Sequence, residues 1–293
     1  MKREVKRMSI ISAIYESENG YKLEYKLQGN LLGKPVVFFH GFGSSYSLVE
    51  YDLHLLNHYN FYIISINRPG YGRSSLLKRY TLSEFIYVVR ELLQFLQIKK
   101  VDLIGWSAGG LYAQVFKKLC PDYVNSLSLI SSAVPFNTGS AKAVLPFQWR
   151  FIRFINMHMS PLARFYFKRI SKSLEKNKEK TIDKAIAAME PEDKKILSSP
   201  LFRDNLIKST EEAYDNDGLA VYYDALAMME NISIDYDNDA KIYIWQGNKD
   251  DIWPEKTTLY FKKIYKQSQY MLVENEGHLL IQSKMKDILD KIN

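Results

Sequence analysis

Runs of Val, Ile, Leu, Phe and Tyr recur along the chain and predict eight β-strands. The first two runs alternate apolar and polar positions, which indicates an antiparallel pair at the start of the chain. Later runs are almost continuously apolar, which is typical of parallel strands that helices cover on both faces. The predicted strands are residues 9–15, 21–28, 35–40, 61–66, 101–105, 127–132, 241–246 and 268–273.

Segments with a helical repeat of apolar positions separate the strands after the third run. This alternation of strands and helices predicts an α/β protein with a mostly parallel eight-stranded sheet, flanked by helices that form the crossover connections. The predicted helices of this core are residues 46–58, 81–97, 108–119, 255–266 and 279–292.

The alternation stops between about residues 135 and 240, where no strand-like run is found. Several short helices are expected there, with stops at Pro146, Pro161, Pro191, Pro200 and Gly218. A helical segment between two strands of one sheet predicts a cap, or lid, inserted into the core. We therefore expect a core of residues 1–134 and 241–293, and a helical cap at residues 135–240.

The composition is that of a globular protein, with 46% hydrophobic and 25% charged residues in a chain of 293. Residues 1–8 carry charge but lack the apolar stretch of a secretory signal, and no run approaches the roughly 18 apolar residues that span a bilayer. A cytoplasmic protein without a transmembrane segment is expected. The single cysteine, Cys120, excludes an internal disulfide, and we expect it to be a packed helical thiol.

The net charge of +7 is dispersed and does not indicate nucleic-acid binding. Within the predicted cap, however, residues 142–180 hold ten basic and two acidic residues, whereas residues 181–240 hold five basic and fourteen acidic ones. The basic half is also rich in Phe and Trp. The default interpretation is two halves that neutralise each other on a solvated surface, with the aromatic side chains packed over the site. The alternative is a docking face for an acidic partner or an anionic surface.

The segment from Gly105 to Gly109 places Ser107 between two glycines, directly after a predicted strand and before a predicted helix. This arrangement is typical of a nucleophile elbow, in which a sharp turn holds the serine in a strained backbone conformation with its hydroxyl exposed. The helix that starts at Ala108 directs its N–H groups and positive dipole end toward the site. Ser107 is therefore the candidate nucleophile.

Two further residues follow predicted strands and complete a catalytic pattern. Asp250 lies in the loop after the strand at 241–246, with Asp251 as its rival, and His278 follows the last strand. Of the five histidines, only His278 comes after this aspartate. The chain order of Ser107, Asp250 and His278 is the order of the Ser, Asp and His residues in α/β-hydrolases.

The loop His40-Gly-Phe-Gly follows the third predicted strand. The backbone N–H groups of Phe42 and Ala108 are predicted to form an oxyanion hole, and His40 is expected to hold the loop by hydrogen bonds. His54 and His58 are four residues apart, but no Glu or Cys completes a zinc pattern. A surface helix, and no metal site, is predicted there.

Together with the turn from Arg68 to Ser74, these motifs resemble the α/β-hydrolase fold family over about residues 20–290. Within it, Trp106 before the serine and Gly109-Gly110 after it resemble the carboxylesterases that include the pimeloyl-carrier-protein methyl ester esterase. Two positions depart from the pattern. Asn67 stands where relatives often have Asp, which is expected to alter a loop hydrogen bond but not the chemistry, and Gln282 stands where they often have an acid.

The resemblance implies a serine hydrolase that cleaves carboxylic esters of a small-molecule acyl substrate through an acyl-enzyme, with no metal or organic cofactor. Dehalogenases and epoxide hydrolases of this fold use an elbow carboxylate, so serine excludes their mechanism. Thioesters, amides and carbon–carbon bonds stay open as alternatives. So does a ligand-sensing or partner-binding protein that keeps the triad.

Overall fold

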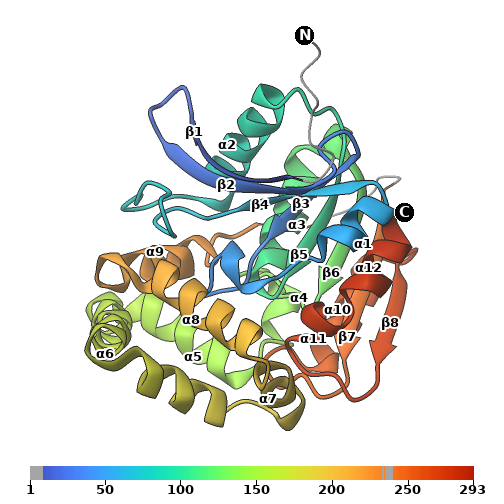
Figure 1. The fold of residues 1–293 in the computed structure, drawn as a ribbon. Helices are drawn as coiled ribbons and strands as arrows, with labels where there is room; N and C mark the ends of the chain where they lie inside the picture. Colours follow the sequence, from blue (N-terminus) through green and yellow to red (C-terminus); the bar gives the residue numbers. More distant parts are fainter. Residues whose placement is uncertain (1–8, 233, 235–239) are drawn as a thin grey trace.

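The computed structural model describes residues 9–232, 234 and 240–293, so the prediction about a secretory signal concerns residues outside this range. An eight-stranded sheet forms the centre of the molecule, as predicted (Figure 1). Its strands are β1 (Ser9–Glu16), β2 (Lys22–Gly29), β3 (Lys34–Phe39), β4 (Phe61–Ile66), β5 (Val101–Trp106), β6 (Val124–Ile130), β7 (Lys241–Gly247) and β8 (Gln269–Val273).

The strand order is β1-β2-β4-β3-β5-β6-β7-β8. Strands β1 and β2 pair antiparallel, as predicted from their alternating pattern, and β2 is also antiparallel to β4. All other neighbouring strands are parallel. The carboxyl ends of β3, β5, β7 and β8 therefore lie at one edge of the sheet, where open α/β sheets bind their ligands.

Helices cover both faces of the parallel strands, which explains why those strands are apolar on both sides. Val37 and Leu103 pack in one hydrophobic cluster, and Val36 and Ile104 pack in the other. The first cluster includes side chains from α2 (Leu82–Phe95), α3 (Ala108–Leu119) and α10 (Glu255–Ile264). The second includes side chains from α1 (Leu53–His58), α11 (Leu280–Ser283) and α12 (Met285–Ile292).

Three predicted elements differ from the structure by more than their exact ends. The helix expected over residues 279–292 is divided at Lys284 into α11 and α12. The expected continuous helix over residues 46–58 is wrong: a 3-10 helix at Tyr46–Leu48 is separate from α1, which starts after its N-cap Asp52. The sixth strand was expected at 127–132, but it begins at Val124 and ends at Ile130, because Ser131 has a positive φ of 44° that ends the extended conformation. Cys120 is buried at the end of α3, as predicted.

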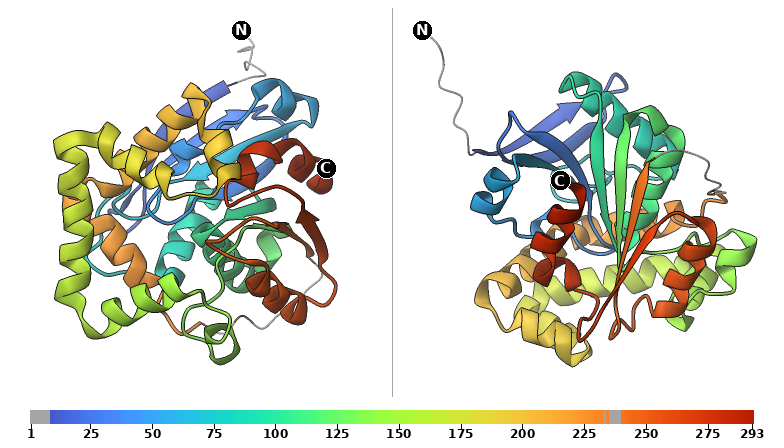
Figure 2. Two further views of the ribbon diagram at one scale, coloured as in Figure 1. Left: turned by 90° about the horizontal axis from the view of Figure 1, so that it is seen from below. Right: turned by 90° about the vertical axis from the view of Figure 1, so that its right-hand side faces the viewer.

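Between β6 and β7 the described residues form helices and no strand, and we refer to residues 139–227 as the insertion. The insertion lies beside one end of the sheet (Figures 1 and 2). Its α-helices are α4 (Gly139–Lys142), α5 (Phe147–His158), α6 (Ser160–Ala187), α7 (Pro191–Leu197), α8 (Pro200–Tyr214) and α9 (Leu219–Ala227).

Helix α6 spans 28 residues and consists of two helices that meet at a kink at Asn177, where φ is −162° and ψ is 89°. Pro191 and Pro200 are the first residues of α7 and α8, as their missing N–H groups allow. Among the residues described, no helix is both long and apolar enough to cross a bilayer.

Candidate active site

Ser107 occupies the sharp turn between β5 and α3. Its backbone has φ 55° and ψ −126°, a conformation that non-glycine residues rarely adopt. Its N–H donates to the carbonyl of Ile130 at 3.0 Å, and its own carbonyl accepts from the N–H of Ala133 at 2.8 Å. A Cβ atom on Gly109 would lie 2.0 Å from the carbonyl oxygen of Phe39, so only glycine fits two residues after the serine. These contacts fix the strained turn in place.

His278 and Asp250 lie side by side, although 28 residues separate them in the chain. The Nδ1 atom of His278 is 3.1 Å from Oδ2 of Asp250. The Oδ1 atom of Asp250 also accepts from the N–H groups of Ile252 at 3.0 Å and Trp253 at 2.9 Å, which orients the carboxylate. The Asp250 side chain is fully buried and that of His278 is 12% exposed. The rival carboxylate, Asp251, belongs to an exposed residue.

Trp106 links the elbow to the loop that carries His278. Its indole N–H donates to the carbonyl of His278 at 2.9 Å, and the centroids of the two rings are 5.2 Å apart. A Cβ on Gly41 would lie 2.5 Å from the Trp106 ring, so glycine is also needed where the loop after β3 passes the elbow. No hydrogen bond joins the Ser107 hydroxyl to His278 within the described residues; such bonds in free enzymes often tighten only when substrate binds.

The insertion contributes a carboxylate, Asp193 of α7, that the sequence analysis did not identify. It accepts the backbone N–H of His278 at 3.1 Å and that of Leu279 at 2.8 Å. Burial raises the pKa of Asp193 from its ordinary value, although these two N–H groups act against the increase. No sequence motif marks this residue, because its partners lie about 85 positions further along the chain.

The electrostatic surroundings of His278 favour its protonated form. Burial alone lowers the pKa of His278, but the negative charge of Asp250 and the hydrogen bond with it outweigh burial. Asp193 and Asp251 add smaller attractions, and the net effect is a pKa above the ordinary histidine value. A base of this kind can take a proton from a nearby hydroxyl and hold it as a stabilised imidazolium.

The loop after β3 presents the N–H of Phe42, and α3 begins with the N–H of Ala108. Neither group donates a hydrogen bond to any other residue that the structure describes. His40 supports this loop: because the carbonyl of Gly41 only accepts and the N–H of Arg68 only donates, Nδ1 of His40 must carry the proton and Nε2 must accept. Burial and the Arg68 charge hold the pKa of His40 well below its usual range, so this ring is neutral.

Arg68 fixes the same loop from a fully buried position. Its guanidinium donates to the carbonyl of His40 and, at 2.8 Å, to that of Gly41. It also pairs at 2.9 Å with the buried carboxylate of Asp224, in α9 of the insertion. The hydroxyls of three buried tyrosines complete the coordination of this carboxylate: Tyr71, Tyr80 and Tyr112. No sequence signal predicted this network, because Arg68 and Asp224 are 156 residues apart in the chain.

The two departures from the family pattern have local explanations. Asn67 donates its amide to Glu24 at 2.9 Å and accepts the N–H of Tyr46 at 3.0 Å, so an aspartate here would face the carboxylate of Glu24. Gln282 donates its amide to the carbonyl of Leu48 at 2.7 Å, a bond that a carboxylate could not make. Both positions need an amide in this chain.

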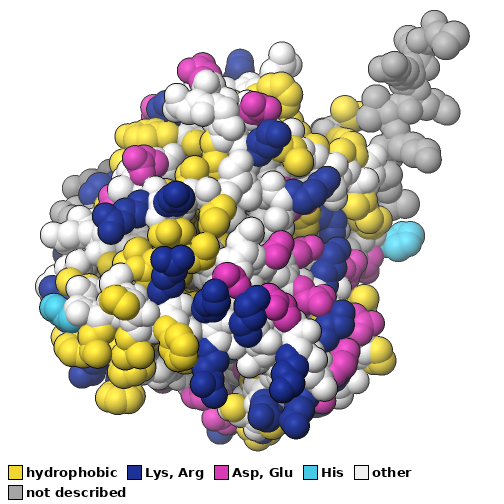
Figure 3. Space-filling view, turned by 90° about the vertical axis from the view of Figure 1, so that its left-hand side faces the viewer, with side chains coloured by type: hydrophobic (Ala, Val, Ile, Leu, Met, Phe, Trp, Pro, Cys, Tyr) yellow, Lys and Arg dark blue, Asp and Glu magenta, His cyan; other side chains and the backbone are white. Residues whose placement is uncertain are grey.

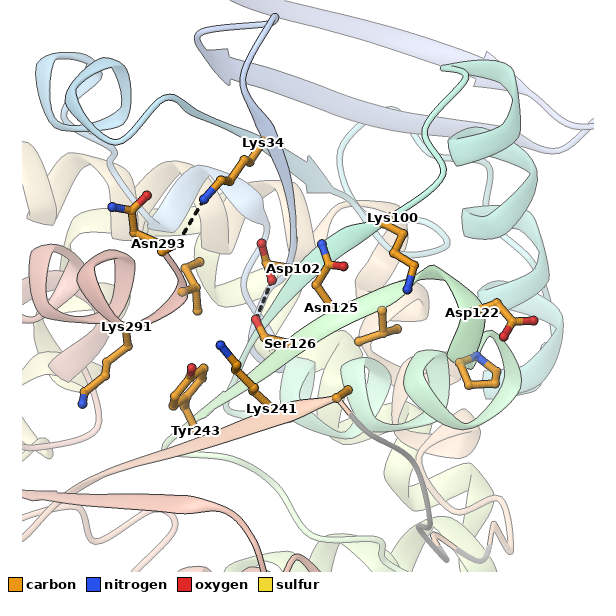
Figure 4. A pocket seen from close by; sticks show the side chains of 14 residues that line it. Lys34, Lys100, Asp102, Asp122, Asn125, Ser126, Lys241, Tyr243, Lys291 and Asn293 are labelled. Atoms are coloured by element: carbon orange, nitrogen blue, oxygen red, sulfur yellow. Dashed lines mark hydrogen bonds between the residues drawn. The ribbon is translucent and has the colours of Figure 1, made fainter.

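A pocket of about 500 Å³ opens at the opposite edge of the sheet, near the amino ends of β5 and β7 (Figure 4). Lys34, Lys100 and Lys241 line it, together with Asp102, which accepts from the Ser126 hydroxyl at 2.6 Å. Burial raises the pKa of Asp102 from its ordinary value. Because Ser107 follows the carboxyl end of β5, this pocket is separate from the candidate active site.

Other candidate chemistry is not brought together. His54 and His58 belong to exposed residues on α1, as the surface-helix interpretation predicts. In the part of the chain that the structure describes, no three His, Cys, Asp or Glu residues are grouped so that they could hold a metal ion.

The family model of the alpha/beta hydrolase fold matches residues 34–284. This match covers more than half of the chain and includes every residue of the candidate site. The chain belongs to this family.

Curated relatives are similar over shorter regions. An uncharacterized hydrolase of Bacillus subtilis is 36% identical over 114 residues, which are 39% of each chain. The pimeloyl-[acyl-carrier protein] methyl ester esterase of Wigglesworthia glossinidia brevipalpis is 33% identical over 101 residues, 34% of this chain and 37% of that protein. The match thus spans little more than a third of the length of these relatives.

Solved structures share the fold over nearly the whole chain. An esterase from Exiguobacterium antarcticum has a TM-score of 0.67 at 18% identity and covers 96% of this α/β-hydrolase and 98% of its own chain. The epoxide hydrolase CorEH has a TM-score of 0.71 at 18% identity, with 97% of both chains covered.

Proposed function

We propose that this α/β-hydrolase is a serine esterase with Ser107, His278 and Asp250 as its catalytic triad. The observation that carries the proposal is the pairing of Asp250 with His278, 3.1 Å apart, on loops at the same sheet edge as the strained turn of Ser107. In the proposed reaction, His278 takes the proton of the Ser107 hydroxyl as the serine oxygen attacks the acyl carbonyl. Asp250 fixes the imidazole tautomer and stabilises its charge.

Breakdown of the tetrahedral intermediate releases the alcohol, which takes the proton from His278, and leaves the acyl group on Ser107. Water then attacks the acyl-enzyme, with His278 again as the base, and the carboxylic acid leaves. The N–H groups of Phe42 and Ala108 stabilise the negative oxygen in both halves of the reaction. Each donor of this kind contributes about 3 kcal/mol to the transition state.

A carbonyl substrate follows from the identity of the elbow residue. The epoxide hydrolase neighbour has the same fold, but fold alone does not determine chemistry, and a serine cannot form the alkyl-ester intermediate of a carboxylate nucleophile. The names of the esterase relative and the esterase neighbour support an ester as the substrate.

Residues 135–240, which include the helical insertion, are the proposed cap of this site, with residues 1–134 and 241–293 as the core. Phe42 of the loop after β3 packs edge-on against Trp149 of α5 and Phe167 of α6, at centroid distances of 5.6 and 6.0 Å. Aromatic side chains of the insertion therefore lie next to the proposed oxyanion hole. Such apolar surroundings suit the acyl chain of an ester.

The test is hydrolysis of p-nitrophenyl esters of increasing acyl length by the wild type and by Ser107→Ala and His278→Ala. We expect kcat to fall by at least about a thousandfold in each variant, because removal of a triad member leaves only binding and the oxyanion hole. Exposed Ser198→Ala is the matched control and should keep full activity. Wild-type turnover that persists in either triad variant would exclude the mechanism.

A further inference from the structure

The insertion exposes a group of large hydrophobic side chains on and after α5. We define the apolar face as the exposed large hydrophobic residues between the start of α5 and the first turns of α6, each between 43 and 81% exposed. They are Phe147, Phe151, Phe154, Met157, Met159, Leu162, Phe165 and Tyr166. Figure 3 shows hydrophobic side chains gathered on the lower part of this side of the molecule, bordered by Lys and Arg side chains.

Helix α5 is apolar on two sides, which is unusual for a surface helix. Trp149 and Ile155 are buried on the side that faces the protein. Phe147, Phe151 and Phe154 follow one another at helical spacing on the side that faces outward. Soluble proteins rarely expose apolar patches of this kind unless something binds there. The outward side of α5 therefore needs an occupant.

The stretch of chain that carries the apolar face is basic. Residues 142–174 contain seven basic residues and no acid. A pocket of about 750 Å³ adjoins the face at Phe165, and its charged lining residues are Lys78, Arg79, Arg164 and Lys168. Lys168 pairs with Asp217 at 3.0 Å, whereas Lys78, Arg79 and Arg164 form no ion pair with any described residue. This pocket suits a group with negative charge.

The combination of exposed apolar side chains and basic side chains distinguishes between two binding partners, a second copy of the chain and an anionic bilayer. A second copy related by a two-fold axis would bring the two basic regions toward each other, and like charges across an interface are unfavourable. A bilayer with anionic lipids satisfies both properties, because Phe, Met and Leu enter the acyl boundary while Lys and Arg contact phosphates.

We propose that the apolar face docks on an anionic phospholipid surface, with the pocket of Arg79 and Arg164 receiving a lipid phosphate. The inference does not depend on the esterase proposal, since none of these residues belongs to the triad. The opposite side of α5 carries Trp149, which packs on Phe42, so the docked surface lies one helix away from the proposed oxyanion hole.

The experiment is co-sedimentation of the full chain with vesicles of phosphatidylcholine alone, or of phosphatidylcholine mixed with phosphatidylglycerol. We expect binding to the mixed vesicles that weakens as salt rises above about 0.1 M, where charges are screened within about 10 Å. The double variant Phe151→Ser with Phe154→Ser should bind at least about tenfold more weakly, because burial of one Phe side chain alone is worth that factor. Leu201→Ser, which changes a residue 52% exposed on α8, is the matched control and should bind as the wild type does.

A second pair of variants tests the basic pocket. Arg79→Glu with Arg164→Glu should reduce binding to the mixed vesicles at least about tenfold, since each basic residue near an anionic surface contributes on the order of a fivefold change. Lys99→Glu, an exposed lysine of the core, should have little effect. Ser107→Ala should bind as the wild type does, which separates docking from esterase activity.

Four results would overturn the proposal. The first is an absence of binding to the mixed vesicles, and the second is unchanged binding by the double Phe variant. The third is a wild-type dimer in analytical ultracentrifugation that the double Phe variant converts to a monomer, because a second copy would then cover the face. Capture of polyglutamate without vesicle binding would also contradict it and would assign the face to an acidic protein.

Discussion

Ser107, Asp250 and His278 come from short loops that directly follow core strands, whereas the insertion contacts the loops of the candidate site through two buried carboxylates, Asp193 and Asp224. The first group is fixed mainly by local turns and by sheet topology. The second group acts across more than 80 residues of chain, on the His278 backbone and on Arg68. The core thus supplies the proposed chemistry, and the insertion holds the loops that carry it.

The largest expected effect separates the two neighbouring aspartates of the core. Asp250→Asn should lower kcat on the order of ten-thousandfold, because the amide no longer holds the His278 tautomer and cannot stabilise its charge. Asp251→Asn should lower kcat less than about threefold, since it adds only a minor attraction. Ester kinetics measure both. A larger loss of kcat in Asp251→Asn than in Asp250→Asn would mean that Asp251, and not Asp250, is the acid of the triad.

The next effect concerns the buried ion pair between Asp224 of the insertion and Arg68 of the core. Asp224→Ala leaves the guanidinium of Arg68 buried without its carboxylate, and we expect a loss of about 3 to 5 kcal/mol in the free energy of unfolding. Urea denaturation followed by fluorescence measures it. Asp217→Ala, whose ion pairs are solvent-exposed, is the control and should cost less than about 1 kcal/mol. Equal losses in the two variants would contradict a special role for the buried pair.

Asp193 provides a pH test of the contact between the insertion and the loop that carries His278. If His278 must be neutral to act as a base, kcat/KM should fall as the pH drops through its pKa, which lies above the ordinary value of about 6.5. Asp193→Asn removes one attraction for the protonated ring, so the acid limb of the profile should move to lower pH. Exposed Asp204→Asn should leave the limb in place. An acid limb that moves to higher pH in Asp193→Asn would contradict an attraction between Asp193 and the protonated ring of His278.

The smallest effect tests the strain at the elbow. Ser107→Gly should raise the free energy of unfolding by up to about 1 kcal/mol, because glycine adopts the positive φ of this turn without steric cost. Ser107→Ala keeps the Cβ atom and therefore the strain, so it should be less stable than the glycine variant. Thermal unfolding of the two inactive proteins makes the comparison. Identical stabilities of the two variants would mean that the Cβ atom at this position causes no backbone strain.

The core was predictable because its signals are local. The strand at 61–66 and the helix at 108–119 have the predicted bounds, and β5 runs directly into the elbow. The helix expected at 46–58 was wrong because the caps at Ser45 and Asp52 create two separate starts. Local periodicity does not show which of several capping residues is used.

The partners of the insertion could not be predicted for a different reason. Asp193 and Asp224 lie among many acids in residues 181–240, and nothing nearby in the sequence distinguishes a buried acid from a solvated one. Their roles depend on which helices pack against the loops after β3 and β8. The amide of Asn67 could not be explained from the sequence either, because its partner Glu24 is 43 residues away in the chain.

The most direct test of the central claim is chemical labelling of the proposed nucleophile. The protein is treated with a fluorophosphonate probe, and the modified residue is located by peptide mass spectrometry. We predict one adduct per chain, on Ser107, formed together with loss of ester hydrolysis and strongly slowed in His278→Ala. An adduct at another residue, or ester hydrolysis that continues after Ser107 is fully modified, would contradict the account.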